Sequence, residues 1–169
     1  NYLTKFDNAF ARENTPCPNT FFNDSYEVYN ADWTPALLEE FEKRRGYKLE
    51  NYLRELLAKG KTDISCRVVS DYRETLGEML LTDFTEQWTS WAHSHGATTR
   101  NQAHGSPANI IDLYAAVDIP ECEIFGITDF DIPGLRKDEM RKINDGDPVT
   151  LKMASSAAHI TGKKITSSE

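Results

Sequence analysis

Long apolar runs are missing from this chain, and so is any concentration of positive charge. No stretch approaches the ~20 consecutive apolar residues that a transmembrane helix needs, so we predict no membrane span. The 19 lysines and arginines are outnumbered by 27 aspartates and glutamates, and they occur in small groups such as 43–45 and 163–164. With a net charge of −8 and no basic stripe, the chain is not expected to bind nucleic acid.

Cysteine pairs and several catalytic motifs are missing as well. Cys17, Cys66 and Cys122 form no C-x-x-C pair, and their spacing excludes a zinc ribbon. The sequence contains no G-x-G-x-x-G, no P-loop and no G-x-S-x-G elbow. Neither Cys17 nor Cys66 has a convincing histidine partner. Nucleophilic catalysis by serine or cysteine is therefore disfavoured.

What the chain does contain is a regular alternation of short strands and helices. We predict strands near 20–25, 97–102, 121–125 and 164–168. Helices are expected over 2–13, 35–45, 49–58, 63–95, 108–116 and 148–161, with a helical turn near 137–143. Three of these helices start with a capping residue followed by proline, at 34–35, 106–107 and 147–148, because proline suits the first helical position.

The strongest periodic signal lies between Asp63, a plausible N-cap, and Gly96, a plausible stop. Apolar residues recur there every four positions, which predicts one helix of about 30 residues. The repeating positions are Val68, Tyr72, Leu76, Leu80, Phe84 and Trp88. We interpret this stripe as part of the core and not as a cofactor site.

Alternating strands and helices imply a parallel sheet with right-handed crossovers, and hence an α/β fold. Four strands cannot close a (β/α)₈ TIM barrel, so we expect about half of such a barrel with long crossover helices. A small doubly wound sheet is the second choice. We interpret residues 1–169 as a single partial domain, truncated at both ends. Its two open sheet edges should make it self-associate.

Seven polar residues are expected at or just beyond the carboxyl ends of the strands, where parallel barrels keep their sites. They are Asp24, Glu27, Gln102, His104, Glu121, Glu123 and Glu169. Carboxylates beside aromatic residues such as Tyr26, Tyr29 and Trp33 suit sugar binding and acid–base hydrolysis. Carboxylate and carbonyl oxygens would also suit calcium. His93 and His95 could bind zinc, but the helix dipole favours histidine at that position without a metal.

Several motifs together resemble glycoside hydrolase family 106, whose members are large bacterial α-L-rhamnosidases. The longest is N-Q-A-H-G-S-P-A-N-I-I-D-L-Y at 101–114, followed by D-I-P-E-C-E at 118–123. The others are F-N-D-S-Y-E at 22–27, W-T-P at 33–35, K-R-R-G-Y at 43–47, A-S-S-A-A-H at 154–159 and S-S-E at 167–169. The resemblance covers nearly the whole chain, although family members are several times longer.

The resemblance implies a catalytic (β/α)₈ barrel that hydrolyses terminal rhamnosyl linkages of plant polysaccharides such as rhamnogalacturonans. It also implies inversion at the anomeric carbon by a glutamate acid and base, a calcium ion near the sugar, and a periplasmic or secreted location. The isolated chain is expected to be inactive. A non-catalytic carbohydrate- or calcium-binding α/β fragment is the alternative.

We assign the catalytic roles by the setting of each glutamate. Glu123 has apolar neighbours in its strand, which suits a proton donor, whereas Glu169 follows small hydroxyl residues in a wetter setting that suits an ionised base. Glu27 is the third candidate for either role. Substrate contacts are expected from Asp24, Gln102, His104, Glu121 and Trp33. Side chains alternate along a strand, so Glu121 and Glu123 should share one face.

Overall fold

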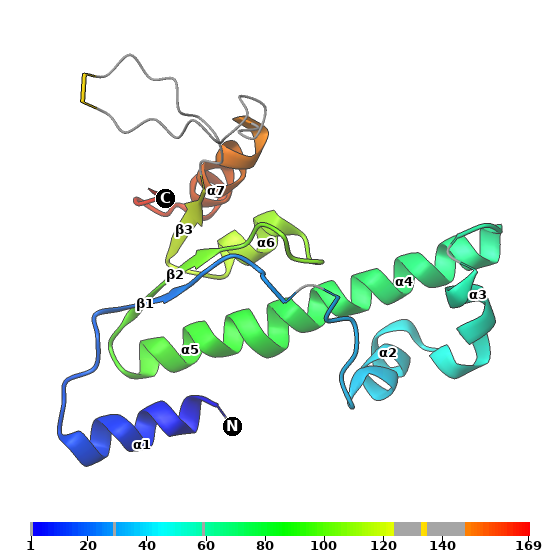
Figure 1. The fold of residues 1–169 in the computed structure, drawn as a ribbon, viewed down its shortest axis with the longest axis horizontal. Coiled ribbons are helices and arrows are strands. Elements are labelled where there is room, and N and C mark those ends of the chain that lie inside the picture. The colour runs from blue at the N-terminus through cyan, green and yellow to red at the C-terminus, as the bar shows by residue number, and fades with distance from the viewer. Residues whose placement is uncertain (1, 29, 59, 124–132, 135–147) are drawn as a thin grey trace.

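The computed structural model describes residues 2–28, 30–58, 60–123, 133–134 and 148–169. Its centre is a parallel sheet of four strands in the order β1-β2-β3-β4 (Figure 1). The strands are β1 (Thr20–Asn23), β2 (Thr98–Gln102), β3 (Ile119–Cys122) and β4 (Ser167–Ser168). The predicted α/β class with a parallel sheet is confirmed. The tail of the third predicted strand, residues 124–125, and the helical turn near 137–143 lie outside the described residues.

The strand order is sequential and shows no reversal. A doubly wound sheet needs a switch point at which the strand order turns back, and the described strands contain none. Successive parallel strands joined by right-handed crossovers carry their helices on one face of the sheet. The arrangement is therefore consistent with part of a (β/α)₈ barrel and disfavours the doubly wound alternative.

The fourth strand is much shorter than expected. Only Ser167 and Ser168 pair with β3, whereas the prediction started the strand at residue 164. Ile165, the one apolar residue of that stretch, is 60% exposed. A strand is held by its ladder and by burial of alternate side chains, and residues 164–166 have no partner strand among the described residues.

The helices match the predicted pattern with small shifts at their ends. They are α1 (Leu3–Glu13), α2 (Leu37–Arg45), α3 (Leu53–Leu57), α6 (Ile110–Ala115) and α7 (Pro148–Thr161), with a 3₁₀ turn η1 (Leu49–Tyr52) before α3. The capping predictions were wrong at three helix starts. α2 begins at Leu37, with Ala36 and not Thr34 at its N-cap position. Asn109, not Ser106, caps α6 by accepting from the Ile111 N–H, and Thr62, not Asp63, accepts from the Ser65 N–H before α4.

One long helical rod passes beneath the sheet, as the sequence predicted (Figure 1). It runs through α4 (Asp63–Met79), η2 (Leu80–Glu86) and α5 (Gln87–Ser94), which are 17, 7 and 8 residues long. The middle segment is π-helical, which the periodicity did not predict. The stripe is only partly core: Val68 and Trp88 are buried, but Phe84 is 46% exposed, because the π-helical turn changes the face each side chain takes.

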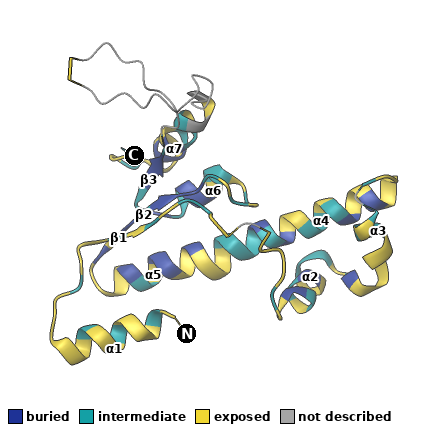
Figure 2. Cartoon of the chain, viewed as in Figure 1, coloured by how far each residue is buried: buried dark blue, intermediate teal, exposed yellow. Residues whose placement is uncertain are grey.

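The main core lies between the sheet and the helices. Alanines of α7 approach β3 closely, as their small size predicted, and Ala154 and Ala157 are fully buried there. The cluster comprises Ala103, Leu113, Tyr114, Cys122, Ala154 and Ala157. α1 contributes no buried residue and is yellow over most of its surface in Figure 2. Within the described residues no helix is long and apolar enough to cross a bilayer.

Candidate active site

The carboxyl ends of all four strands open onto one cavity of about 220 Å³. Residues 24–27 follow β1, His104 and Gly105 follow β2, Glu123 follows β3, and Glu169 follows β4. The lining consists of Asp24, Ser25, Tyr26, Glu27, His104, Gly105, Glu123 and Glu169. Parallel strands end at the same edge of their sheet, so residues distant in sequence become neighbours. All three glutamates that we predicted as catalytic line this cavity.

Two of the loops around the cavity are joined through their backbones. The Tyr26 N–H donates to the His104 carbonyl at 3.1 Å. Gly105 has φ +78°, and a Cβ there would lie 3.1 Å from the Tyr26 carbonyl oxygen, so a larger residue would be strained and crowded. The Asp24 carboxylate accepts from the Ser25 N–H at 2.7 Å, which fixes the start of the first loop. These contacts set the positions of Glu27 and His104.

Glu123 and His104 form a close pair inside the cavity. The Glu123 Oε2 atom lies 3.2 Å from His104 Nε2, and the two side chains are 22% and 13% exposed. Glu123 follows the end of β3 and does not lie in the middle of a strand as we expected. Glu27 and Glu169, also in the lining, are exposed. The cavity thus holds one shielded carboxyl beside an imidazole and two more open carboxylates.

Beneath the cavity lies a polar network that does not line it. Gln102 and Glu121 are each 2% exposed. The Gln102 Nε2 amide donates to Glu121 Oε1 at 3.1 Å and to Glu169 Oε2 at 2.6 Å. Arg100 Nε lies 3.0 Å from Glu121 Oε2. Of the five residues that we predicted to contact substrate, Gln102 and Glu121 do not line the cavity and lie behind Glu169.

The predicted alternation of side chains places this network on the face away from the helices. Gln102 and Glu121 are register partners in β2 and β3, and His104 and Glu123 follow two residues later on the same face. Sequence reasoning missed Arg100. Its signal was the same alternation, since it precedes Gln102 by two residues. Its guanidinium lies 4.3 Å from the centre of the Phe22 ring.

The aromatic residues are only partly at the site. Tyr26 lines the cavity, whereas Trp33 is 60% exposed and does not line it. Tyr29 lies outside the described residues. Residues 30–36 form no regular element, so the strand periodicity that located the carboxylates could not locate Trp33.

The two histidines at the end of the long rod bind different aspartates. His93 Nε2 contacts both oxygens of Asp118, at 2.9 and 3.0 Å, and His95 Nε2 lies 2.8 Å from Asp7 Oδ1. Because each histidine contacts its own aspartate, a metal ion shared by the two is disfavoured. These contacts, and not the helix dipole alone, account for the two histidines at this position. Both pairs tie α5 to neighbouring elements, to β3 and to α1 respectively.

The described residues do not by themselves provide a calcium site. No group of three or more histidine, cysteine or acidic side chains among them is arranged to hold a metal ion. The cavity has four carboxylates in its lining, but one of them, Asp24, already accepts from the Ser25 N–H, and Glu123 faces His104. Calcium requires six to eight oxygen ligands around one point.

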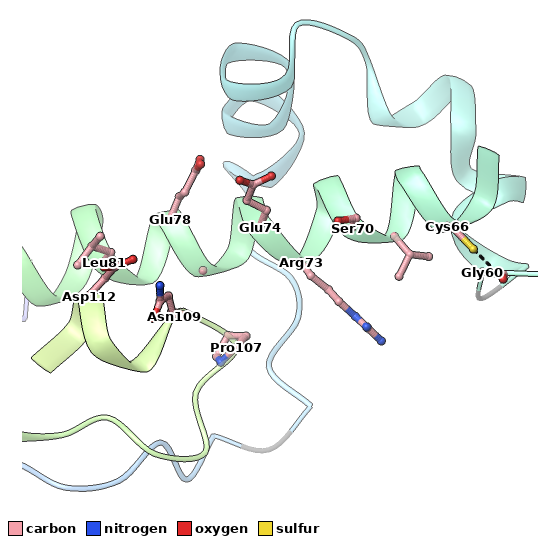
Figure 3. Close-up of a pocket in the computed structure, with 13 residues that line it drawn as sticks. Gly60, Cys66, Ser70, Arg73, Glu74, Glu78, Leu81, Pro107, Asn109 and Asp112 are labelled. Carbon is pink, nitrogen blue, oxygen red and sulfur yellow. Dashed lines mark hydrogen bonds between the residues drawn. The ribbon is translucent and has the colours of Figure 1, made fainter. Parts of the chain in front are cut away.

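Two other cavities lie away from the strand ends. One of about 680 Å³ runs between α4 and the segment before α6, with Arg73, Glu74 and Glu78 on one side and Asn109 and Asp112 on the other (Figure 3). Another, of about 350 Å³, is aromatic and lies beside β1 and α5. Although both are larger, neither gathers carboxyl groups from several strand ends, which is where parallel α/β enzymes carry out chemistry.

Comparisons with known proteins cover the whole chain or nearly all of it. The profile of glycoside hydrolase family 106, described as alpha-L-rhamnosidase, matches residues 1–169. The chain belongs to glycoside hydrolase family 106. The solved structure of a rhamnosidase from Novosphingobium sp. PP1Y superimposes with a TM-score of 0.70 at 23% identity. The match covers 99% of this chain and 16% of that one, and it shows the same fold.

A curated relative from Formosa agariphila, named "Putative beta-glucuronidase", is 29% identical over 155 residues. The match covers 89% of this chain and 12% of that protein. The family 106 chain described here thus spans between about a tenth and a sixth of the length of these relatives. The family description and the name of the Formosa relative both denote glycosidases.

Proposed function

We propose that this chain forms part of the catalytic domain of an inverting α-L-rhamnosidase. The observation that carries the proposal is the strand-end cavity, where Glu27, Glu123 and Glu169 come from three different strands. Inverting hydrolysis uses two carboxyl groups about 6.5–9.5 Å apart, with a water molecule between one of them and the sugar. A cavity of about 220 Å³ gives room for part of a sugar ring beside them.

Glu123 acts as the general acid in this proposal. Its side chain is mostly shielded and touches His104, so an imidazolium or imidazole can orient the carboxyl group toward the leaving oxygen. Glu169 acts as the general base. It is exposed to solvent and held by an amide donor, an arrangement that suits an ionised carboxylate next to water. Glu27 can replace either residue or hold the sugar.

The lining favours a neutral sugar over a uronic acid. The described lining residues include four carboxylates and one histidine, and no lysine or arginine. An anionic sugar would meet like charge without a compensating cation, which is costly in a confined site. A terminal rhamnosyl group is uncharged. Its hydroxyl groups can donate to the Asp24 and Glu27 carboxylates, and its methyl group and ring can contact Tyr26 and, after loop movement, Trp33.

We further propose that the substrates are rhamnogalacturonan-type plant polysaccharides or their oligosaccharides.

A calcium ion near the sugar is part of the same proposal for the longer protein, with most of its ligands supplied by residues outside the described part of this chain. Exhaustive chelation should then reduce rhamnosidase activity, and readdition of calcium should restore it. Full activity after chelation would contradict the calcium proposal and leave the carboxylate mechanism standing.

The first test is substitution of glutamate by glutamine in the longer protein that contains this chain. Glu123→Gln and Glu169→Gln should each lower kcat on an aryl α-L-rhamnoside by ~10³-fold or more, because a proton transfer is lost. Glu39→Gln, on the exposed face of α2, is the matched control and should keep full activity. Near-normal turnover by either site variant would remove that residue from the mechanism.

The name of the Formosa relative makes a uronide the second candidate substrate. An aryl β-D-glucuronide assayed beside the aryl α-L-rhamnoside decides between them. Turnover of the glucuronide alone would contradict the rhamnoside assignment. Binding of rhamnose-containing oligosaccharides without any turnover would instead support the non-catalytic alternative.

A further inference from the structure

We infer that Gln102 is a positioning residue that holds the general base, Glu169, through its side-chain amide. This inference rests on the function proposed above. Its starting point is a hydrogen bond of 2.6 Å from Gln102 Nε2 to Glu169 Oε2, the shortest bond that Gln102 makes among the described residues. A carboxylate that accepts a short amide hydrogen bond is fixed in orientation.

The amide is itself held from behind. Its second N–H donates to Glu121 Oε1 at 3.1 Å, and Glu121 is 2% exposed. Because both partners of the Nε2 group are carboxylates, the nitrogen must face them and the side-chain orientation is settled. Arg100, 3.0 Å from the other oxygen of Glu121, supplies the positive charge that lets this carboxylate stay buried.

The sheet makes this arrangement possible. Gln102 and Glu121 are direct register partners, and Glu121 pairs in turn with Ser167 in β4, two residues before Glu169. The Glu169 N–H donates to the Cys122 carbonyl at 3.0 Å, so the backbone of Glu169 continues the ladder. Three adjacent strands therefore link an arginine, a carboxylate, an amide and a second carboxylate through successive contacts.

The burial of Gln102 distinguishes a positioning role from a direct role in substrate binding. Gln102 is 2% exposed and is absent from the residues that line the cavity, so a bound sugar would touch Glu169 and not the amide behind it. Loss of the amide should therefore act on proton transfer by Glu169 and leave sugar affinity nearly unchanged. Its effect should also disappear when Glu169 is already disabled, because residues that act as one unit are not additive.

The experiment uses the longer enzyme and an aryl α-L-rhamnoside. Gln102→Met removes both N–H groups at similar length, and Gln102→Asn keeps an amide but withdraws it from Glu169. Each should lower kcat about 10–100-fold, with KM changed less than about threefold. The acidic limb of the pH profile of kcat/KM should move to higher pH. In a Glu169→Gln background, adding Gln102→Asn should lower kcat further by less than about twofold.

Asn101→Ala is the matched control. Asn101 is an equally buried amide on the same strand, but its partner is Asn23 at 2.7 Å on the helix-facing side. It should lower thermal stability while kcat and the pH profile stay unchanged. The inference is overturned if the Gln102 variants change only KM, or if they leave kcat and the pH profile intact. It is also overturned if the loss is as large in the Glu169→Gln background.

Failure of the proposed function would look different. If the enzyme turns over no rhamnoside, or if Glu169→Gln is fully active, then the base assignment itself is wrong. If Glu169→Gln is inactive and Gln102→Asn is not impaired, the base assignment stands and only the role of Gln102 is refuted.

Discussion

At the scale of single residues, buried or half-buried carboxylates in this chain are surrounded by donors. Asp118 accepts from the Thr99 N–H at 2.8 Å, from the Thr99 hydroxyl at 3.1 Å and from His93. Burial by itself would raise the pKa of Asp118, but hydrogen bonds from His93 and Thr99 outweigh burial and hold the pKa below its ordinary value. Two of these contacts come from Thr99 in the neighbouring strand β2 and the third from His93 in α5.

The lowered pKa of Asp118 predicts how stability depends on pH. An acid with a folded-state pKa below its unfolded value stabilises the fold above the unfolded pKa, near 4, and loses this contribution as pH falls through the folded pKa. Asp118→Asn should therefore reduce the free energy of unfolding by about 1–2 kcal/mol at pH 7. At pH 2.5 the difference from the wild type should be clearly smaller.

Urea denaturation of the chain at the two pH values measures this difference. Asp63→Asn is the control, because Asp63 pairs with Arg67 on the surface, where both side chains are more than three-quarters exposed. Such pairs contribute little, so this variant should differ from the wild type by less than about 0.5 kcal/mol. An equal loss at both pH values for Asp118→Asn would show that its charge is not responsible.

At the scale of elements, the long rod shows what periodicity can and cannot predict. Apolar residues every four positions correctly predicted one helix from Asp63 to Ser94. They gave no sign of the π-helical turn, in which the Thr85 hydroxyl donates to the Leu80 carbonyl five residues back. A widened turn is stabilised by its tertiary neighbours. Arg44 of α2 contacts Thr82 and Asp83 within that turn.

The rod also approaches the segment before α6 very closely at Gly77. A Cβ at this position would lie 3.0 Å from Ala108 Cα and 3.4 Å from the Pro107 carbonyl oxygen. Gly77→Val should destabilise the chain by about 2–3 kcal/mol, because backbone atoms cannot rotate away as side chains can. Thermal or urea unfolding measures the loss.

Ser70→Val is the matched control for Gly77→Val. Ser70 lies on the same helix and is exposed, so the substitution tests the β-branched side chain without the close contact. It should cost less than about 0.5 kcal/mol. Equal effects of the two substitutions would mean that the approach of Ala108 can relax.

At the scale of the whole molecule, the described surface carries large exposed aromatic side chains and two open sheet edges. Phe22 and Phe84 are 43% and 46% exposed, and both line the aromatic cavity beside β1. Strands β1 and β4 form the two edges of the described sheet.

These open edges and aromatic surfaces predict self-association of the 169-residue chain. Exposed strand edges offer unpaired N–H and C=O groups, and contiguous apolar surface favours contact between copies. Light scattering should show a mass that rises with concentration. Phe22→Lys combined with Phe84→Glu should reduce the association. A constant monomer mass over the full concentration range, with the wild-type chain folded, would contradict the prediction.

The candidate site was predictable to the extent that it depends on strand ends. Glu27, Glu123 and Glu169 line one cavity because parallel strands end together, and each lies just after a strand of the structure. Gln102 and Glu121 followed the same rule, yet they lie under the cavity. The strand-end rule predicts the position of a site residue only to within a few residues along the chain. A shift of that size decides whether a side chain lines the cavity or is buried beneath it.

The sequence by itself determined the parallel α/β alternation, the long rod with its stop at Gly96, where φ is positive, and the strand ends at which carboxylates gather. These depend on local periodicity and backbone preference. Only the tertiary structure decided which carboxylate faces the cavity and which is buried. That choice depends on strand register, which brings Arg100, Gln102, Glu121 and Glu169 into contact across neighbouring strands. Register is set by packing between segments far apart in the chain.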